Sequence, residues 1–265
     1  MRTLFPLLLI GSLSAVGAWG QLVEEFNPPR GNCCLPASAQ TLANQLLDWN
    51  QLGRYHAANE ALKKQPADPK RVVFMGDSIT DIWKLADQFP GKPYVDRGIS
   101  GQTTPQMLVR MYPDVIDLKP AAVAILAGTN DIAHNTGPET AAMIEENIQA
   151  MTDIAQAHGI KVILCSVTPI SDYTRPQGRG GAAADPNART MQSVQRPPAD
   201  ILKLNAWMKD YAAKVHAVYA DYFAALVDDK GMLKDGFSAD GLHPNQKGFD
   251  LMAPVIEAAI QKALQ

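Results

Sequence analysis

Short apolar runs alternate with helical stretches along most of this 265-residue chain, and this alternation constrains the fold more than any other feature. Continuous apolar runs of five to seven residues are typical of strands buried on both faces, and apolar residues three or four apart are typical of helices. The expected strands are 71–75, 94–99, 121–126, 161–167 and 217–221. The expected helices are 82–88, 105–117, 138–158, 199–216 and 245–264.

Strands that alternate with helices along the chain predict an α/β fold. Helical crossovers between parallel strands cover both faces of the sheet, so we expect a three-layer α/β/α sandwich with a five-stranded parallel sheet over residues 66–265. Hydrophobic residues make up 46% of the chain and charged residues 19%, which is enough apolar material for one sizeable core. The formal net charge of −3, without a long basic run, argues against nucleic acid as a partner.

The first twenty residues have the pattern of a secretory signal peptide. Arg2 provides an early positive charge, an apolar stretch follows, and Ala18 and Gly20 suit cleavage before Gln21. The alternative is a membrane anchor, because residues 3–19 are just long enough to span a bilayer. We expect cleavage of residues 1–20, a secreted or periplasmic protein, and no stable membrane span afterwards.

Residues 21–65 lie between this leader and the expected domain. They form a Pro- and Gly-rich arm that includes Cys33 and Cys34, followed by a helical pattern that Gly53 can divide into two helices. The third cysteine, Cys165, lies in an apolar run and is expected to be buried and inert. Three cysteines cannot all pair within one chain, and the pairing stays open. No C-x-x-C or His pair stands at ligand spacing, so we expect no metal and no cofactor.

Residues 171–200 interrupt the alternation. The segment is rich in Gly, Pro and Ala, has almost no apolar anchors, and contains four arginines: Arg175, Arg179, Arg189 and Arg196. An irregular segment of this length inside a compact domain is either a functional flap or a loop without function. We expect an insertion whose arginines can face an anionic or sugar substrate.

Ser78, in Gly-Asp-Ser directly after the first strand, has two interpretations. A serine at a helix start can cap the helix by accepting from its free backbone N–H groups. The same position suits a nucleophile, because helix N-terminal amides stabilise developing negative charge. A serine hydroxyl attacks poorly unless a base accepts its proton, so the nucleophile interpretation requires a histidine held by an acid.

The stretch DGLHP provides both groups. Asp240 and His243 are three residues apart, so one turn places both side chains on the same side. Asp240 can then accept from Nδ1–H of His243 and leave Nε2 facing a serine. Pro244 can begin the following helix. The alternative for His243 is a structural histidine.

An acyl-transfer site also needs donors for an oxyanion. Gly101 lies in a turn after the second strand, and Asn130 in GTND after the third strand carries an amide NH₂. Each alone has a simpler interpretation, a tight turn for Gly101 and an Asx-turn for Asn130. Because the carboxyl ends of parallel strands meet at one edge of a sheet, we expect both beside the Ser78 N–H, which gives three donors.

The ordered set GDS, GISGQTT, GTND and DGLHP resembles the four sequence blocks of the SGNH (GDSL) esterase and lipase superfamily, over residues 71 to about 262. The chain is similar to the branch of platelet-activating factor acetylhydrolase catalytic subunits and bacterial acetylesterases. The resemblance implies a flavodoxin-like SGNH hydrolase fold. It also implies a Ser78, Asp240 and His243 triad, with Gly101 and Asn130 as oxyanion donors beside Ser78. Asp96 departs from the family pattern, which often has Asn there.

The resulting hypothesis is a secreted serine esterase that works through an acyl-enzyme. We expect short-chain acyl esters, such as acetyl esters of sugars or lipids, because no long apolar run indicates a tunnel for a fatty acid. One alternative is an acyltransferase that uses a carbohydrate acceptor. Another is a non-catalytic envelope binding protein on the same scaffold.

Overall fold

The computed structural model of the chain describes residues 46–173 and 191–265, which belong to one compact unit, Asn44–Gln265. The expected signal peptide, the arm with Cys33 and Cys34, and most of the 171–200 insertion lie outside the described residues. None of the described helices is long and apolar enough to cross a bilayer.

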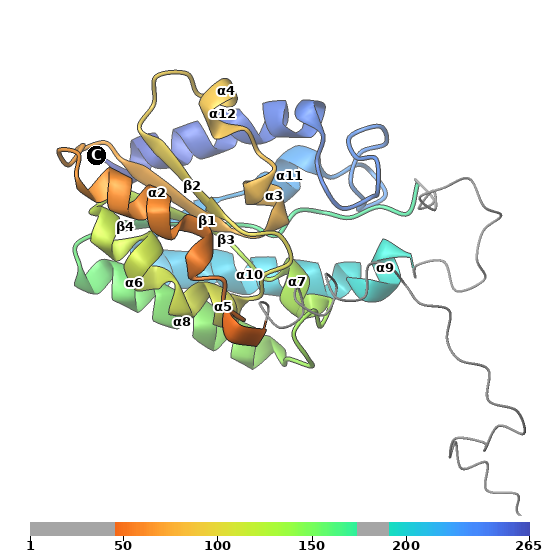
Figure 1. Cartoon of the computed structure of the whole chain (residues 1–265). Coiled ribbons are helices and arrows are strands. Elements are labelled where there is room, and N and C mark those ends of the chain that lie inside the picture. The colour runs from red at the N-terminus through yellow and green to blue at the C-terminus, as the bar shows by residue number, and fades with distance from the viewer. Residues whose placement is uncertain (1–45, 174–190) are drawn as a thin grey trace, which may run out of the picture. The chain divides into compact units, whose positions relative to one another are not determined.

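Five parallel strands form a single sheet, as the alternating apolar runs predict (Figure 1). Their order across the sheet is β2-β1-β3-β4-β5, and every neighbouring pair is parallel. Each strand overlaps its expected run; β2 and β3 are one residue shorter than expected, and β4 and β5 are two residues shorter. The strands are β1 (Val72–Gly76), β2 (Tyr94–Gly98), β3 (Ala122–Leu126), β4 (Lys161–Cys165) and β5 (Val218–Ala220).

Helices cover both faces of the sheet and confirm the three-layer α/β/α sandwich (Figure 1). Side chains alternate along a strand, so Val73 and Met75 of β1 face one helical layer while Val72 and Phe74 face the other. The first layer holds α5 (Thr104–Val109), α6 (Met111–Asp114), α8 (Ala141–Ala157) and α10 (Pro198–Lys214). The second holds α3 (Ser78–Asp81), α4 (Leu85–Gln88), α11 (Tyr222–Leu226) and α12 (Gln246–Ala263).

Two expected helices are divided into short pieces. The 82–88 helix is replaced by α3 and α4 on either side of residues 82–84. The 105–117 helix is divided into α5, α6 and the 3₁₀ turn η1 (Ile116–Leu118). Pro113 explains why α5 does not continue into α6, because a continuous helix would need a backbone N–H at residue 113 to bond the carbonyl of Val109.

A buried polar network joins α2 (Gly53–Lys63) to the first helical layer. Asn59 of α2 donates to Asp114 Oδ1 over 2.6 Å and accepts from Arg97 Nε over 2.8 Å. Arg110, fully buried, donates to Asp114 Oδ2 over 2.6 Å. A helix expected in the 21–65 segment thus packs within the same compact unit as the sheet.

Gly98 lets α3 approach the end of β2. A Cβ atom there would lie 2.2 Å from the backbone N of Asp81 and 2.8 Å from its Cα, so any side chain would force α3 away. Since Ser78 is the first residue of α3, this contact helps to set where its hydroxyl lies.

Candidate active site

The first three strands end level with one another. Gly76 at the end of β1 pairs with Gly98 of β2 on one side and with Leu126 of β3 on the other. The segments that carry Ser78, Gly101 and Asn130 therefore leave the sheet at one edge. Because β2 and β3 lie on opposite sides of β1, this edge includes the point where the strand order reverses, where open α/β sheets bind ligands.

Asp77, and not Ser78, caps the helix that follows β1. The Asp77 carboxylate accepts from the backbone N of Ile79 over 2.9 Å, which corrects the cap interpretation of Ser78. Asp77 is fully buried, and its Oδ2 has no hydrogen-bond partner among the described residues. Burial raises the pKa of Asp77 to about 7, against the lowering effect of the Ile79 N–H and of His243. The Ser78 hydroxyl is left available for another partner.

That partner is His243. Its Nε2 lies 2.8 Å from Ser78 Oγ, across 165 positions of sequence, and its Nδ1 lies 2.6 Å from Asp240 Oδ2. Asp240 Oδ1 meanwhile accepts from the backbone N–H groups of Leu242 and His243 over 3.0 and 2.9 Å. The three side chains expected from the DGLHP and GDS stretches therefore form one continuous hydrogen-bonded line.

Hydrogen bonding keeps Asp240 ionised. Partial burial acts to raise the pKa of Asp240, but the donors on His243 and Leu242 outweigh it and hold the pKa well below its usual range. A carboxylate held in this way fixes a proton on Nδ1 of His243 and leaves the Nε2 lone pair for Ser78. Pro244 does not begin the last helix as expected, because Asn245 caps α12 by accepting from Lys247 N over 3.0 Å.

The expected oxyanion donors line the same pocket. Gly101 has a φ of +84°, a conformation that favours glycine, and no described residue accepts from its backbone N–H. The Ser78 N–H is at the first position of α3, where a helix offers no acceptor. Asn130 Nδ2 donates to Gln102 O over 3.0 Å, so one of its two amide hydrogens stays free for a ligand.

A pocket of about 590 Å³ brings these groups together. Among the described residues, its lining contains two large apolar side chains, one guanidinium and no carboxylate. The lining residues are Ser78, Ile82, Ser100, Gly101, Asn130, Asn135, Arg196, Leu242 and His243. No group of three or more His, Cys, Asp or Glu side chains is gathered as a metal site within the described residues.

Of the lining residues, Asn135 was not singled out by the sequence patterns, and Arg196 was named only as one of four arginines of the insertion that can face a substrate. Residues 191–200, expected to belong to an irregular insertion, instead form α9 (Gln192–Gln195) and the start of α10. Arg196 between them is only 5% exposed. Its one distinguishing signal is its place directly before Pro197-Pro198 at a helix start, outside the Gly- and Ala-rich run.

The residue after Asn130 anchors this turn to α5. Asp131 is fully buried and accepts from the backbone N and from Oγ1 of Thr104, over 2.8 and 2.5 Å. Burial raises the pKa of Asp131, and burial together with Asp131 raises the pKa of Glu139 to about 7. The turn that carries Asn130 is therefore held to α5 by a buried carboxyl whose pKa is raised.

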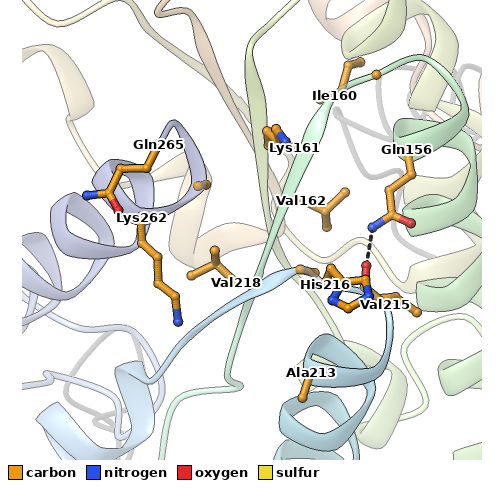
Figure 2. A pocket seen from close by; sticks show the side chains of 13 residues that line it. Gln156, Ile160, Lys161, Val162, Ala213, Val215, His216, Val218, Lys262 and Gln265 are labelled. Atoms are coloured by element: carbon orange, nitrogen blue, oxygen red, sulfur yellow. Dashed lines mark hydrogen bonds between the residues drawn. The ribbon is translucent and has the colours of Figure 1, made fainter.

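A second pocket, of about 600 Å³, lies at the opposite edge of the sheet (Figure 2). Figure 2 shows Lys161 and Val162 of β4 between Lys262 of α12 and the segment around His216. Gln156 Nε2 donates to Val215 O over 2.8 Å in its wall. It contains no hydroxyl nucleophile beside a histidine, so the chemistry described above belongs to the other edge.

Comparison with known proteins identifies the family. A model of the GDSL-like lipase/acylhydrolase family matches residues 74–251, more than half of the chain. The chain belongs to this family. A Bacteroides fragilis protein described as an acylhydrolase is 39% identical, with a TM-score of 0.72 over 82% of this chain and 99% of that chain.

More distant relatives match as well. Esterase TesA of Pseudomonas aeruginosa is 30% identical over 126 residues, which is 42% of this chain and 61% of TesA. The two curated relatives are matched over 32% and 61% of their lengths. An acetylxylan esterase from Geobacillus stearothermophilus, 19% identical, shares the fold with a TM-score of 0.56 over 74% of this chain and 95% of its own.

Proposed function

We propose that this GDSL-family chain hydrolyses carboxylic esters through a covalent acyl-enzyme, with Ser78 as nucleophile, His243 as general base and acid, and Asp240 as the group that orients His243. The observation that carries this proposal is the unbroken line from Asp240 Oδ2 to His243 Nδ1 over 2.6 Å, and from His243 Nε2 to Ser78 Oγ over 2.8 Å. This is the geometry that activates a serine hydroxyl.

The first half of the reaction acylates the enzyme. Ser78 Oγ bonds to the ester carbonyl carbon while its proton moves to Nε2 of His243. The carbonyl oxygen becomes an oxyanion, which the N–H groups of Ser78 and Gly101 and the free amide hydrogen of Asn130 stabilise. The bond to the alcohol oxygen then breaks, His243 returns the proton to the leaving alcohol, and the acyl group remains on Ser78.

The second half releases the acid. A water molecule gives a proton to Nε2 of His243 and attacks the acyl carbon, which forms the oxyanion again in the same place. The bond to Ser78 Oγ breaks, and the proton held by His243 returns to it. The Leu242 and His243 backbone N–H groups keep Asp240 ionised while His243 is cationic, so Asp240 stabilises the cation in both halves of the reaction.

Short acyl groups fit this pocket best. Ile82 and Leu242 are the two large apolar side chains in the described part of its lining. The energy of burying an acyl chain grows by about 0.8 kcal/mol for each CH₂ group that finds apolar surface. Since the described wall offers little such surface, chains longer than acetyl gain little by binding there. Acetyl esters of sugars or lipids are the proposed substrates.

An ester panel tests the activity. Wild-type protein should hydrolyse p-nitrophenyl acetate with a kcat/KM at least tenfold above that for the octanoate, and Ser78→Ala should lower kcat by about 10⁴-fold or more. Product analysis with and without an added sugar alcohol separates hydrolysis from acyl transfer. Near-wild-type turnover by Ser78→Ala, compared with Ser193→Ala as a control outside the pocket, refutes the proposal.

We also propose that the protein is exported, on the basis of the leader pattern in residues 1–20. Expression in a bacterial host followed by N-terminal sequencing should give a mature chain that begins at Gln21. Recovery of the intact leader in a membrane fraction contradicts cleavage and supports the anchor alternative.

A further inference from the structure

Arg196 lies in the wall of the pocket, and hydrogen bonds to several neighbours fix its guanidinium there. Its Nε donates to the backbone O and to Oγ1 of Thr129, each over 3.1 Å. Its Nη1 donates to Gln192 Oε1 over 2.9 Å and to Gln195 Oε1 over 3.2 Å. Four acceptors and 5% exposure hold the guanidinium in one place.

The fifth contact of this guanidinium reaches an oxyanion donor. Arg196 Nη2 lies 3.4 Å from Oδ1 of Asn130, which also accepts from Asn135 Nδ2 over 3.0 Å. With two donors on its oxygen, the Asn130 amide cannot flip without placing its NH₂ against them. The amide nitrogen is therefore held on the side of Gln102 O and the pocket.

Arg196 has no ion pair among the described residues, although it is buried. Burial lowers the pKa of Arg196, and the carboxylates of Asp77 and Asp240 act in the opposite direction without forming a salt bridge to it. A buried guanidinium without a carboxylate partner costs stability. Its hydrogen bonds to Thr129 and Asn130 offset part of this cost and join the guanidinium to the turn that carries the oxyanion donor.

We infer that Arg196 is a positioning residue of the oxyanion pocket, which acts by holding the amide of Asn130 with its NH₂ toward the substrate. This inference rests on the proposed function, because it concerns the oxyanion of that reaction. An oxyanion donor loses most of its effect when it is misplaced by a fraction of an ångström, so the loss of its brace affects the transition state more than substrate binding.

The test uses kcat and KM for p-nitrophenyl acetate with the full-length chain. Arg196→Met should lower kcat by about 10- to 100-fold and change KM by less than threefold. In an Asn130→Ala background the same substitution should lower kcat by less than twofold, because the group through which Arg196 acts is already gone. Lys209→Met removes an exposed cation from α10 and should leave both constants unchanged.

A second variant separates positioning from charge and guards against misfolding. Arg196→Lys keeps a buried cation, but its shorter side chain reaches Thr129 and not Asn130. It should lower kcat to a similar extent while its thermal unfolding midpoint stays closer to that of the wild type. Wild-type kcat in Arg196→Lys, or equal losses from Arg196→Met with and without Asn130, overturns the inference. A wild-type protein that neither hydrolyses the ester panel nor reacts with a fluorophosphonate refutes the proposed function itself.

Discussion

At the scale of single residues, the site depends on a division of roles between Asp77 and Ser78. A serine at the start of a helix is drawn toward the free N–H groups of the first turn, and a hydroxyl used in that way faces the backbone. Here the Asp77 carboxylate takes the N–H of Ile79, and the Ser78 hydroxyl lies 2.8 Å from His243. The adjacent acid thus frees the hydroxyl for chemistry.

Asp240→Asn should lower kcat by about 10³- to 10⁴-fold with little change in KM. An asparagine can keep Oδ1 as acceptor for the Leu242 and His243 N–H groups, but its NH₂ would face Nδ1 and impose the wrong tautomer on His243. Steady-state kinetics with p-nitrophenyl acetate measures this effect. Asp235→Asn, an exposed carboxyl nearby, is the control, and equal losses from the two variants contradict the role of Asp240.

Asp77 connects the site to the pH dependence of stability. Its pKa is about 7 in the folded chain, against an ordinary value near 4, so between these values the folded state binds more protons than the unfolded state. The contribution of Asp77 to the free energy of unfolding is therefore present at low pH and is lost as the pH rises through 7. The loss is about 4 kcal/mol, because the two pKa values differ by about three units and each unit corresponds to about 1.4 kcal/mol.

Asp77→Asn removes this titration. The melting temperature of the variant relative to wild type should increase by several degrees between pH 5 and pH 8, as measured by calorimetry at both values. The exposed Asp87→Asn should show no such increase. A difference for Asp77→Asn that is constant or falls with pH is incompatible with a buried, protonated carboxyl.

At the scale of elements, the strands could be predicted because each is a continuous apolar run, buried on both faces of a parallel sheet. The boundaries of the short helices around these strands could not be predicted in the same way. Periodicity alone marks neither the break between α3 and α4 nor the one between α5 and α6, although Pro113 is a helix-breaking signal near the second. Ser78, Gly101 and Asn130 were found because they follow strand ends, and Asp240 and His243 because their spacing before Pro244 suits an acid that holds a histidine. Arg196 was expected only as one of four arginines facing a substrate, and its contacts with Thr129 and Asn130 could not be predicted because that turn is distant in the sequence.

The packing of α2 depends on the buried polar network around Asp114, and this dependence can be tested by substitution. Asp114→Asn should lower the free energy of unfolding by about 3 kcal/mol, because it leaves the buried Arg110 without a countercharge. Chemical denaturation monitored by circular dichroism measures this difference. Asp117→Asn, whose side chain is 46% exposed and lies 3.7 Å from Lys63, should cost less than 1 kcal/mol. Similar costs for the two variants would show that the network contributes little.

At the scale of the whole molecule, two pockets of nearly equal volume lie at opposite edges of one sheet, and the chemistry is at the carboxyl edge. Substitutions at the other edge should therefore leave the reaction unchanged. Lys262→Ala, in the pocket of Figure 2, should keep kcat and KM for p-nitrophenyl acetate within twofold of wild type. A tenfold loss in this variant, with unchanged unfolding, would place function at the amino edge instead.

The central claim is that His243 activates the hydroxyl of Ser78, and covalent trapping tests it most directly. A fluorophosphonate should form one adduct on the native protein, and peptide mapping by mass spectrometry should place it on Ser78. The rate of labelling should fall by at least 10³-fold in His243→Ala while that protein remains folded. An adduct on another residue, or labelling of Ser78 at the wild-type rate without His243, contradicts the account.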